Sequence, residues 1–162
     1  MINLEKIIQL LTDGDVAFVI LGGVAATVHG SSHATFDLDI CYARDPENLK
    51  RLASCLAPLH PHLRGAPEGL PFLWDAETLR RGLNFTLSTD VGDLDLLGEV
   101  GGIGPYLAVL EVSEPNILYG ISCRVLSLEA LIRSKRFAGR SKDLPVVTEL
   151  EAIREAQEPD DK

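Results

Sequence analysis

Three aspartates stand out because each lies in a stretch that is otherwise apolar. Asp37 and Asp39 alternate with apolar residues in the strand-like run 35–42, and Asp95 lies within the similar run 93–97. Side chains on a strand alternate between its two faces, so Asp37 and Asp39 share one face and repel each other. A charge inside a strand is costly unless it is paired, so Asp95 needs a partner. If the two runs are neighbouring strands, the three carboxylates converge on one site.

Carboxylate oxygens are hard ligands that suit Mg²⁺ (or Mn²⁺), which proteins hold with few carboxylates together with substrate phosphates. Two such ions can activate an attacking hydroxyl and stabilise a pyrophosphate leaving group. We therefore interpret Asp37, Asp39 and Asp95 as metal ligands and catalytic residues. The alternative for the first pair alone is that Asp37 begins its strand from a loop and Asp39 pairs with an arginine.

A glycine pair precedes the first two aspartates. The apolar run 16–21 is typical of a strand buried on both faces, and it ends at Gly22 and Gly23. A short helix over 22–29 and a polar loop then lead to the run that carries the aspartates. Glycine allows close approach of the backbone to a ligand, so Gly22 and Gly23 are candidates for contact with a phosphate. A tight turn is the simpler alternative.

The remaining pattern predicts an α/β (α+β) chain. Periodicity and turn residues indicate two hairpins, over 84–97 and 116–126, and an irregular loop over 58–71. They indicate further helices over 4–13, 45–56, 75–81, 103–110, 127–138 and 143–157. We expect one domain over 1–162, with a core over about 16–126, C-terminal helices over about 127–157 and a frayed acidic tail.

Composition narrows the function classes. The chain has 162 residues, of which 46% are hydrophobic and 24% charged, as in an ordinary globular protein. Its formal net charge of −9 argues against nonspecific binding to nucleic acid, which requires neutralisation of phosphates. No apolar run approaches the roughly 20 residues of a membrane span, and no secretory signal is recognisable. Three cysteines without a CxxC motif favour a reducing cytoplasm.

The motifs together resemble a family signature, in which a strand ends in two glycines and two later strands carry an Asp-x-Asp motif and a third aspartate. In this chain the signature reads Leu21-Gly22-Gly23, Asp37-Leu38-Asp39-Ile40 and Asp95. This order resembles the nucleotidyltransferase fold that DNA polymerase β shares with small bacterial and archaeal nucleotidyltransferases. The segment LEALIRSKRFAGRSKDLPVVTEL is similar to part of the nucleotidyltransferases of the AbiEii/AbiGii toxin type. The resemblance implies a mixed β-sheet flanked by helices.

The resemblance also assigns roles to the residues that match the signature. Gly22 and Gly23 would contact the triphosphate. Asp37 and Asp39 would bind Mg²⁺, and Asp95 would be the third carboxylate, which orients the acceptor hydroxyl or acts as a base.

A second group of residues is implied near the nucleotide. Lys135 matches the family lysine and would reach a phosphate as a point charge. Asp143 matches the following aspartate, although a helix N-cap is an equal alternative. Ser32 lies in the polar stretch that the resemblance places near the nucleotide. His29 and His33 flank that stretch, and contact with nucleotide or simple solvation are both open for them.

Five basic residues crowd into the segment 133–142 of this acidic chain: Arg133, Lys135, Arg136, Arg140 and Lys142. One interpretation is a solvated helix face, and the other is a positive wall of a cleft that faces the carboxylates. Arg133 and Arg136 share a helix face, whereas Lys135 points elsewhere, which is consistent with a separate role.

These observations lead to one expected function and one alternative. The expected function is Mg²⁺-dependent transfer of an NMP group from an NTP to an acceptor hydroxyl on RNA, on a protein or on a small molecule. The likeness to toxin-type proteins adds a toxin–antitoxin context, with an antitoxin or another protein as partner. The alternative is a non-catalytic module that binds a nucleotide or a partner protein.

Overall fold

A seven-stranded mixed sheet with the strand order β3-β4-β5-β2-β1-β9-β8 organises the fold. The structure is a computed structural model and describes residues 2–67 and 69–158. The strands of the sheet are β1 (Phe18–Leu21), β2 (Asp37–Tyr42), β3 (His62–Leu63), β4 (Asn84–Thr89), β5 (Gly92–Leu97), β8 (Ser113–Leu118) and β9 (Ile121–Leu126). A separate pairing joins β6 (Glu99–Val100) to β7 (Gly104–Pro105).

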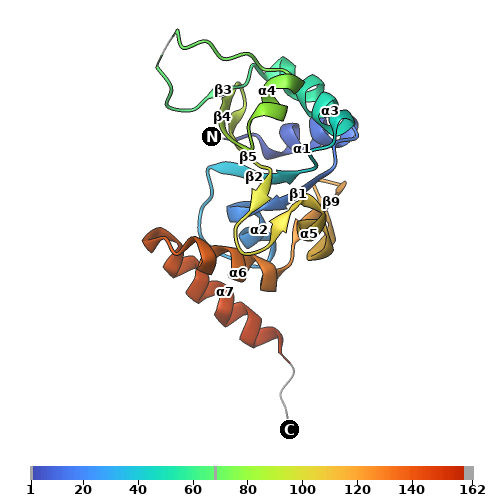
Figure 1. The fold of residues 1–162 in the computed structure, drawn as a ribbon. Helices are drawn as coiled ribbons and strands as arrows, with labels where there is room; N and C mark the ends of the chain where they lie inside the picture. The colour runs from blue at the N-terminus through green and yellow to red at the C-terminus, as the bar shows by residue number, and fades with distance from the viewer. Residues whose placement is uncertain (1, 68, 159–162) are drawn as a thin grey trace.

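Helices cover the strands from two sides (Figure 1). One side carries α1 (Leu4–Asp13), α3 (Pro46–Leu56) and α4 (Ala76–Arg81). The other side carries α2 (Gly22–Val28), α6 (Leu128–Ala138) and α7 (Leu144–Gln157), while α5 (Tyr106–Glu111) packs against β1, β2 and β9. Short 3₁₀ turns, η1 (Ala57–Leu59) and η2 (Ser141–Asp143), complete the elements. The expected mixed sheet flanked by helices is confirmed.

Strand alternation decides which side of the sheet is apolar. In β2, Leu38 and Ile40 are fully buried, and in β5, Leu94 and Leu96 are buried as well. Because neighbours along a strand point to opposite faces, the aspartates of β2 and β5 face the other side. The core on one side of these strands thus forces the carboxylates toward the side that carries α2 and α6.

The central strand β2 lies between an antiparallel and a parallel neighbour. It pairs with β1 in antiparallel fashion, which places Leu21 opposite Asp39. It pairs with β5 in parallel, which places Asp95 opposite Asp39 and Asp93 opposite Asp37. The two strands that were expected to carry the acids are therefore neighbours.

Helix α6 carries Lys135 and has well-defined ends. The Ser127 hydroxyl accepts a hydrogen bond of 3.2 Å from the Ala130 amide, which is an N-cap. Gly139 ends the helix with φ +62°, a left-handed conformation that glycine adopts without strain. Helix α7 begins one short turn later, so the two helices form a tightly connected pair.

Several details differ from the expected elements or lie outside them. The helix expected over 103–110 begins later, as α5, because Gly104 and Pro105 form the short strand β7 first. The expected loop 58–71 contains η1 and the edge strand β3. The expected frayed tail after Glu158 lies outside the described residues.

In the part of the chain that the structure describes, no helix has both the length and the apolar character needed to cross a bilayer. Cys41, Cys55 and Cys123 are all free thiols, so disulfides do not contribute to the stability of this fold.

A buried asparagine links helix α3 to the sheet. Asn48 on α3 is only 1% exposed. Its Oδ1 accepts from the Ala17 amide at 2.7 Å, and its Nδ2 donates to the carbonyls of Ala17 (3.2 Å) and Ala43 (2.7 Å). The side chain thus satisfies buried backbone groups just before β1 and just after β2.

Replacing Asn48 by alanine would leave these backbone groups unpaired. We expect Asn48→Ala to lower the free energy of unfolding by about 2–3 kcal/mol, since each unsatisfied buried group costs about 1–3 kcal/mol. Lys50→Ala on the exposed face of the same helix is the control and should change stability by less than about 0.5 kcal/mol. Urea denaturation measures both, and equal effects would contradict the assigned role of Asn48.

Candidate active site

The structure brings Asp37, Asp39 and Asp95 together. One carboxylate oxygen from each lies within 4.8 Å of the others. The parallel register of β2 and β5 sets this geometry, because Asp39 and Asp95 are directly opposite and Asp37 is two residues before Asp39 on the same face. Three oxygen donors at this spacing fit a hard divalent cation such as Mg²⁺.

The carboxylates are held close enough to disturb each other's protonation. Burial, followed by the negative charges of Asp37 and Asp95, raises the pKa of Asp39 to about 7, and the charge of Lys135 opposes this rise. Burial and the neighbouring Asp95 also raise the pKa of Asp37. Without a cation, the cluster therefore retains a proton near neutral pH, and a bound cation would displace it.

The glycine pair makes room for side chains of the site. Gly22 has φ +65°, and a Cβ there would lie 1.8 Å from Asp39 Oδ2. A Cβ at Gly23 would lie 2.5 Å from Thr35 Oγ1. Both glycines line the same cleft as the carboxylates. The packing reason for Gly22 is thus the approach of the Asp39 carboxylate to the start of α2.

Arg64 holds the side of the cluster nearest the sheet edge. Its Nη2 donates to Asp95 Oδ1 at 2.8 Å and to the Leu87 carbonyl at 2.7 Å. Its Nε lies 3.3 Å from Asp93 Oδ2 but makes no hydrogen bond. Arg64 therefore neutralises part of the charge of Asp93 and Asp95 and fixes one oxygen of Asp95.

Across the cleft, the C-terminal helices supply positive charge. The cleft has a volume of about 630 Å³ and is lined by the carboxylates on one side and by Lys135, Arg140 and Lys142 on the other. Asp143 is 6% exposed and organises this wall: Arg140 Nε donates to it at 2.7 Å, and Lys135 Nζ lies 3.7 Å away. Asp143 precedes α7, but its side chain caps no helix amide.

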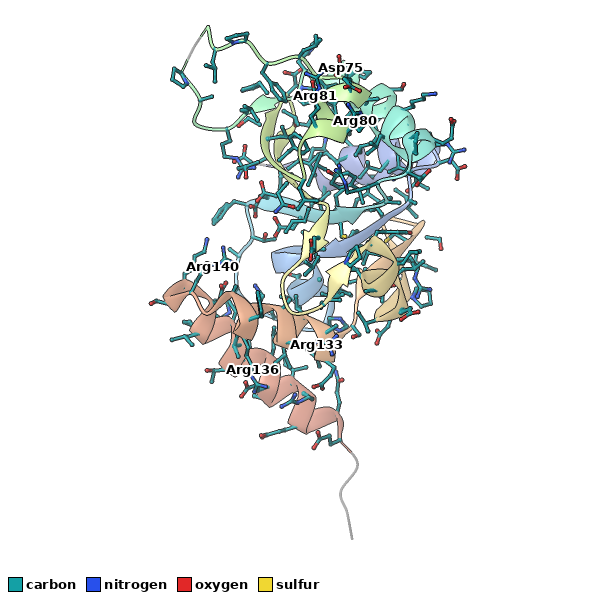
Figure 2. The ribbon with its side chains drawn as sticks, viewed as in Figure 1. Asp75, Arg80, Arg81, Arg133, Arg136 and Arg140 are labelled. Carbon is teal, nitrogen blue, oxygen red and sulfur yellow. The ribbon has the colours of Figure 1, made fainter. Side chains whose placement is uncertain are left out.

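The basic residues of this segment divide between two positions. Arg136 pairs with Glu151 on α7, and Arg133 is exposed. Neither residue lines the cleft. Figure 2 shows Arg133, Arg136 and Arg140 along the C-terminal helices, whereas Arg80 and Arg81 lie on α4 at the far end of the molecule. Both sequence interpretations hold in part: the segment has a solvated face and a cleft face.

Glu149 on α7 ties down the loop between α2 and β2. It accepts hydrogen bonds from the hydroxyls of Ser31 and Ser32, from the Ser32 amide at 3.1 Å and from His33 Nδ1 at 3.0 Å. These bonds lower the pKa of Glu149 to about 2, with Ser31 and Ser32 contributing most. Ser31 and His33 line the cleft, whereas Ser32 does not. His29 lies apart, and its Nε2 donates to the Leu126 carbonyl at 2.7 Å.

Sequence reasoning did not identify Arg64, Glu149, Phe36 or Phe137 as site residues. Arg64 and Glu149 act through contacts with residues about 31 and 117 positions away, which no local pattern reveals. The two phenylalanines line the cleft although 77% of Phe36 and 70% of Phe137 are exposed. The available signal was an aromatic residue close in sequence to a candidate site residue: Phe36 directly precedes Asp37, and Phe137 follows Lys135 by two residues.

Comparison with known proteins identifies structures with a similar fold. No protein-family model and no curated protein matches the sequence. Among solved structures, a candidate nucleotidyltransferase from Thermotoga maritima matches with a TM-score of 0.54 and 17% identity, over 96% of this chain and 94% of its own.

An antibiotic-resistance factor and an antibiotic adenylyltransferase give similar matches. ANT(2″)-Ia, in complex with adenylyl-2″-tobramycin, has a TM-score of 0.57 at 15% identity, over 94% of this chain and 93% of its own. The lincosamide antibiotic adenylyltransferase LnuA, bound to lincomycin, has a TM-score of 0.59 at 14% identity, over 94% of this chain and 98% of its own. At these identities the likeness shows the fold, and the fold of this chain is that of the nucleotidyltransferases.

The raised pKa of Asp39 makes the metal-free protein less stable as the pH rises. Between pH 4 and pH 7 the folded state binds more protons here than the unfolded state, whose pKa is 3.8, so stability falls over this window. We expect Asp39→Asn to be more stable than the wild type by about 2–4 kcal/mol at pH 8 in EDTA. The difference should disappear at pH 4, and urea denaturation at both values tests it. A destabilised variant at pH 8 would contradict the charge repulsion described here.

Loss of Arg64 should have the opposite effect. Arg64→Ala leaves Asp93 and Asp95 unneutralised beside two further carboxylates, and we expect a loss of about 1–2 kcal/mol at pH 8 because the ion pair is largely shielded from solvent. Arg81→Ala, which removes an exposed pair with Glu77, is the matched control and should cost under about 0.5 kcal/mol. Equal losses in denaturation experiments would refute a special role for Arg64.

Proposed function

We propose that this protein is a Mg²⁺-dependent nucleotidyltransferase that moves an NMP group from an NTP to an acceptor hydroxyl. The observation that carries the proposal is the cluster of Asp37, Asp39 and Asp95 facing the cationic wall of Lys135 and Arg140 across one cleft. Anionic ligands for metal on one side and cations for phosphate on the other match the needs of a metal–triphosphate substrate. The nucleotidyltransferase fold supports the same reaction class.

In this proposal, Asp37 and Asp39 would hold the metal ion that accompanies the triphosphate. A bound Mg²⁺ ion would act as a Lewis acid on phosphate oxygens and lower the pKa of a bound hydroxyl. Lys135 and Arg140 would balance the charge of the β- and γ-phosphates. Gly22 and Gly23 line the cleft and would contact the triphosphate through their backbone. Ser32 would reach a phosphate only by releasing Glu149.

Asp95 is proposed as the group that orients the acceptor hydroxyl and accepts its proton. Arg64 holds one of its oxygens and would fix the orientation of the carboxylate for this role. The acceptor oxygen then forms a bond to the α-phosphorus, and the bond to the bridging oxygen breaks. That oxygen keeps the electron pair and leaves with pyrophosphate, so charge and atoms balance.

We further propose a small molecule as the acceptor. Three observations support this. The chain has a net charge of −9, the cleft has a volume of about 630 Å³, and two proteins of the same fold have structures with a small-molecule antibiotic or its adenylylated form bound. An acidic protein would attract a cationic or neutral hydroxyl compound more readily than a polyanionic RNA.

The decisive activity assay uses α-labelled NTPs with Mg²⁺ and three acceptor pools: hydroxyl-bearing small molecules including aminoglycosides and lincosamides, total RNA, and cell protein. We expect label in a small-molecule product. Asp37→Asn should reduce transfer by at least about 100-fold, because even residues that only support metal ligands affect activity by 10–100-fold.

Arg136→Ala, on the same basic segment but outside the cleft, is the control and should retain activity. Label in RNA or protein would contradict the small-molecule acceptor but not the reaction. Full activity of Asp37→Asn would refute the proposed metal site.

A further inference from the structure

Phe137 is unusually exposed for an aromatic residue that lines a cleft. It lies near the C-terminal end of α6, two residues after Lys135, and is 70% exposed. Single exposed apolar residues are common on protein surfaces, so exposure alone says little. The surroundings of this ring are more informative.

The ring rests on a glycine turn. A Cβ at Gly101 would lie 2.5 Å from Phe137 Cδ1 and 2.7 Å from Cε1, and a Cβ at Gly102 would lie 3.0 Å from Phe137 Cβ. Gly102 also has φ +82°, which favours glycine. A side chain at Gly101 would displace the ring. The β6–β7 turn therefore supports one side of Phe137 and leaves the rest of the ring open.

This supported ring lies at the apolar end of the carboxylate cleft. Side chains on a strand alternate with a period of two, so Leu97 lies on the same face of β5 as Asp95. At the rise of a strand it is about 7 Å further along. Leu97, Val100 and Gly101 all line the cleft, as Phe137 does. The cleft wall thus changes from carboxylate to apolar in the direction of Phe137, while Lys135 on the same helix belongs to the cationic wall.

We propose that Phe137, supported by Gly101 and Gly102, stacks on the base of the bound NTP, with Leu97 and Val100 completing an apolar base subsite. This inference rests on the proposed function. In the proposed function the phosphates would lie between Asp37 and Lys135, and a nucleoside that extended along β5 from there would bring its base to Phe137. Every base has a π-face, so stacking here selects for a nucleotide and discriminates weakly among the four bases.

Equilibrium binding measurements distinguish the contribution of the base to affinity from that of the phosphates. Isothermal titration with ATP, GTP, CTP and UTP in Mg²⁺ is compared with inorganic tripolyphosphate, which lacks a base. We expect Phe137→Ala to weaken all four NTPs by about 10- to 100-fold and tripolyphosphate by less than twofold. Phe137→Trp should restore NTP affinity. Leu107→Ala, which removes an equally exposed side chain on α5 outside the cleft, should leave all affinities unchanged.

Three results would overturn the subsite. The first is unchanged NTP affinity in Phe137→Ala. The second is an equal loss of NTP and tripolyphosphate, which would mean that Phe137 acts through Lys135. The third is a change confined to the acceptor KM, which would place the ring on the acceptor. If the wild type binds neither NTP nor tripolyphosphate, the proposed function fails first, and the base subsite fails with it.

Discussion

Mutual repulsion among the carboxylates of β2 and β5 is the constraint on which the site depends. Strand pairing places Asp37, Asp39 and Asp95 within 4.8 Å of one another, and Asp93 lies opposite Asp37 on the neighbouring strand. The protein tolerates this charge by protonation at Asp39, by the guanidinium of Arg64 and by the distant charge of Lys135. Each of these reduces the repulsion among the carboxylates only in part, and a bound divalent cation would neutralise more of their charge.

The C-terminal helices complete the cleft, and two acids on and beside α7 hold them in place. Asp143 fixes the cations of the wall, and Glu149 binds the loop that leads into β2. Because Glu149 contacts Ser31, Ser32 and His33, a movement of α6 and α7 would displace the loop that leads to Asp37. Glu149 therefore links α7 directly to the loop that precedes the metal side of the cleft.

The central part of the fold was predictable from local patterns. The strand that ends in Gly22, the alternation around Asp37 and Asp39, and the acid in the apolar run at Asp95 are all short-range signals. That the two acid-bearing strands are neighbours was an assumption, and their parallel orientation was not predicted. The family resemblance contributed Lys135 and Asp143, which the structure places together in the cleft.

What could not be predicted depends on tertiary contact. Arg64 comes from an irregular loop, and nothing near it in the sequence indicates that its guanidinium reaches Asp95. The packing of Phe137 on Gly101 joins two elements that are far apart in the chain. The sequence pattern also predicted the start of α5 too early, because Gly104 and Pro105 form the short strand β7 before the helix begins.

The most direct test of the central claim is an anomalous-scattering map from crystals grown with Mn²⁺ and a non-hydrolysable NTP. The account predicts a manganese peak about 2.1 Å from oxygens of Asp37 and Asp39 and in contact with the triphosphate. A map with the analogue bound and no peak between these carboxylates, or with the only manganese peak elsewhere on the protein, would contradict it.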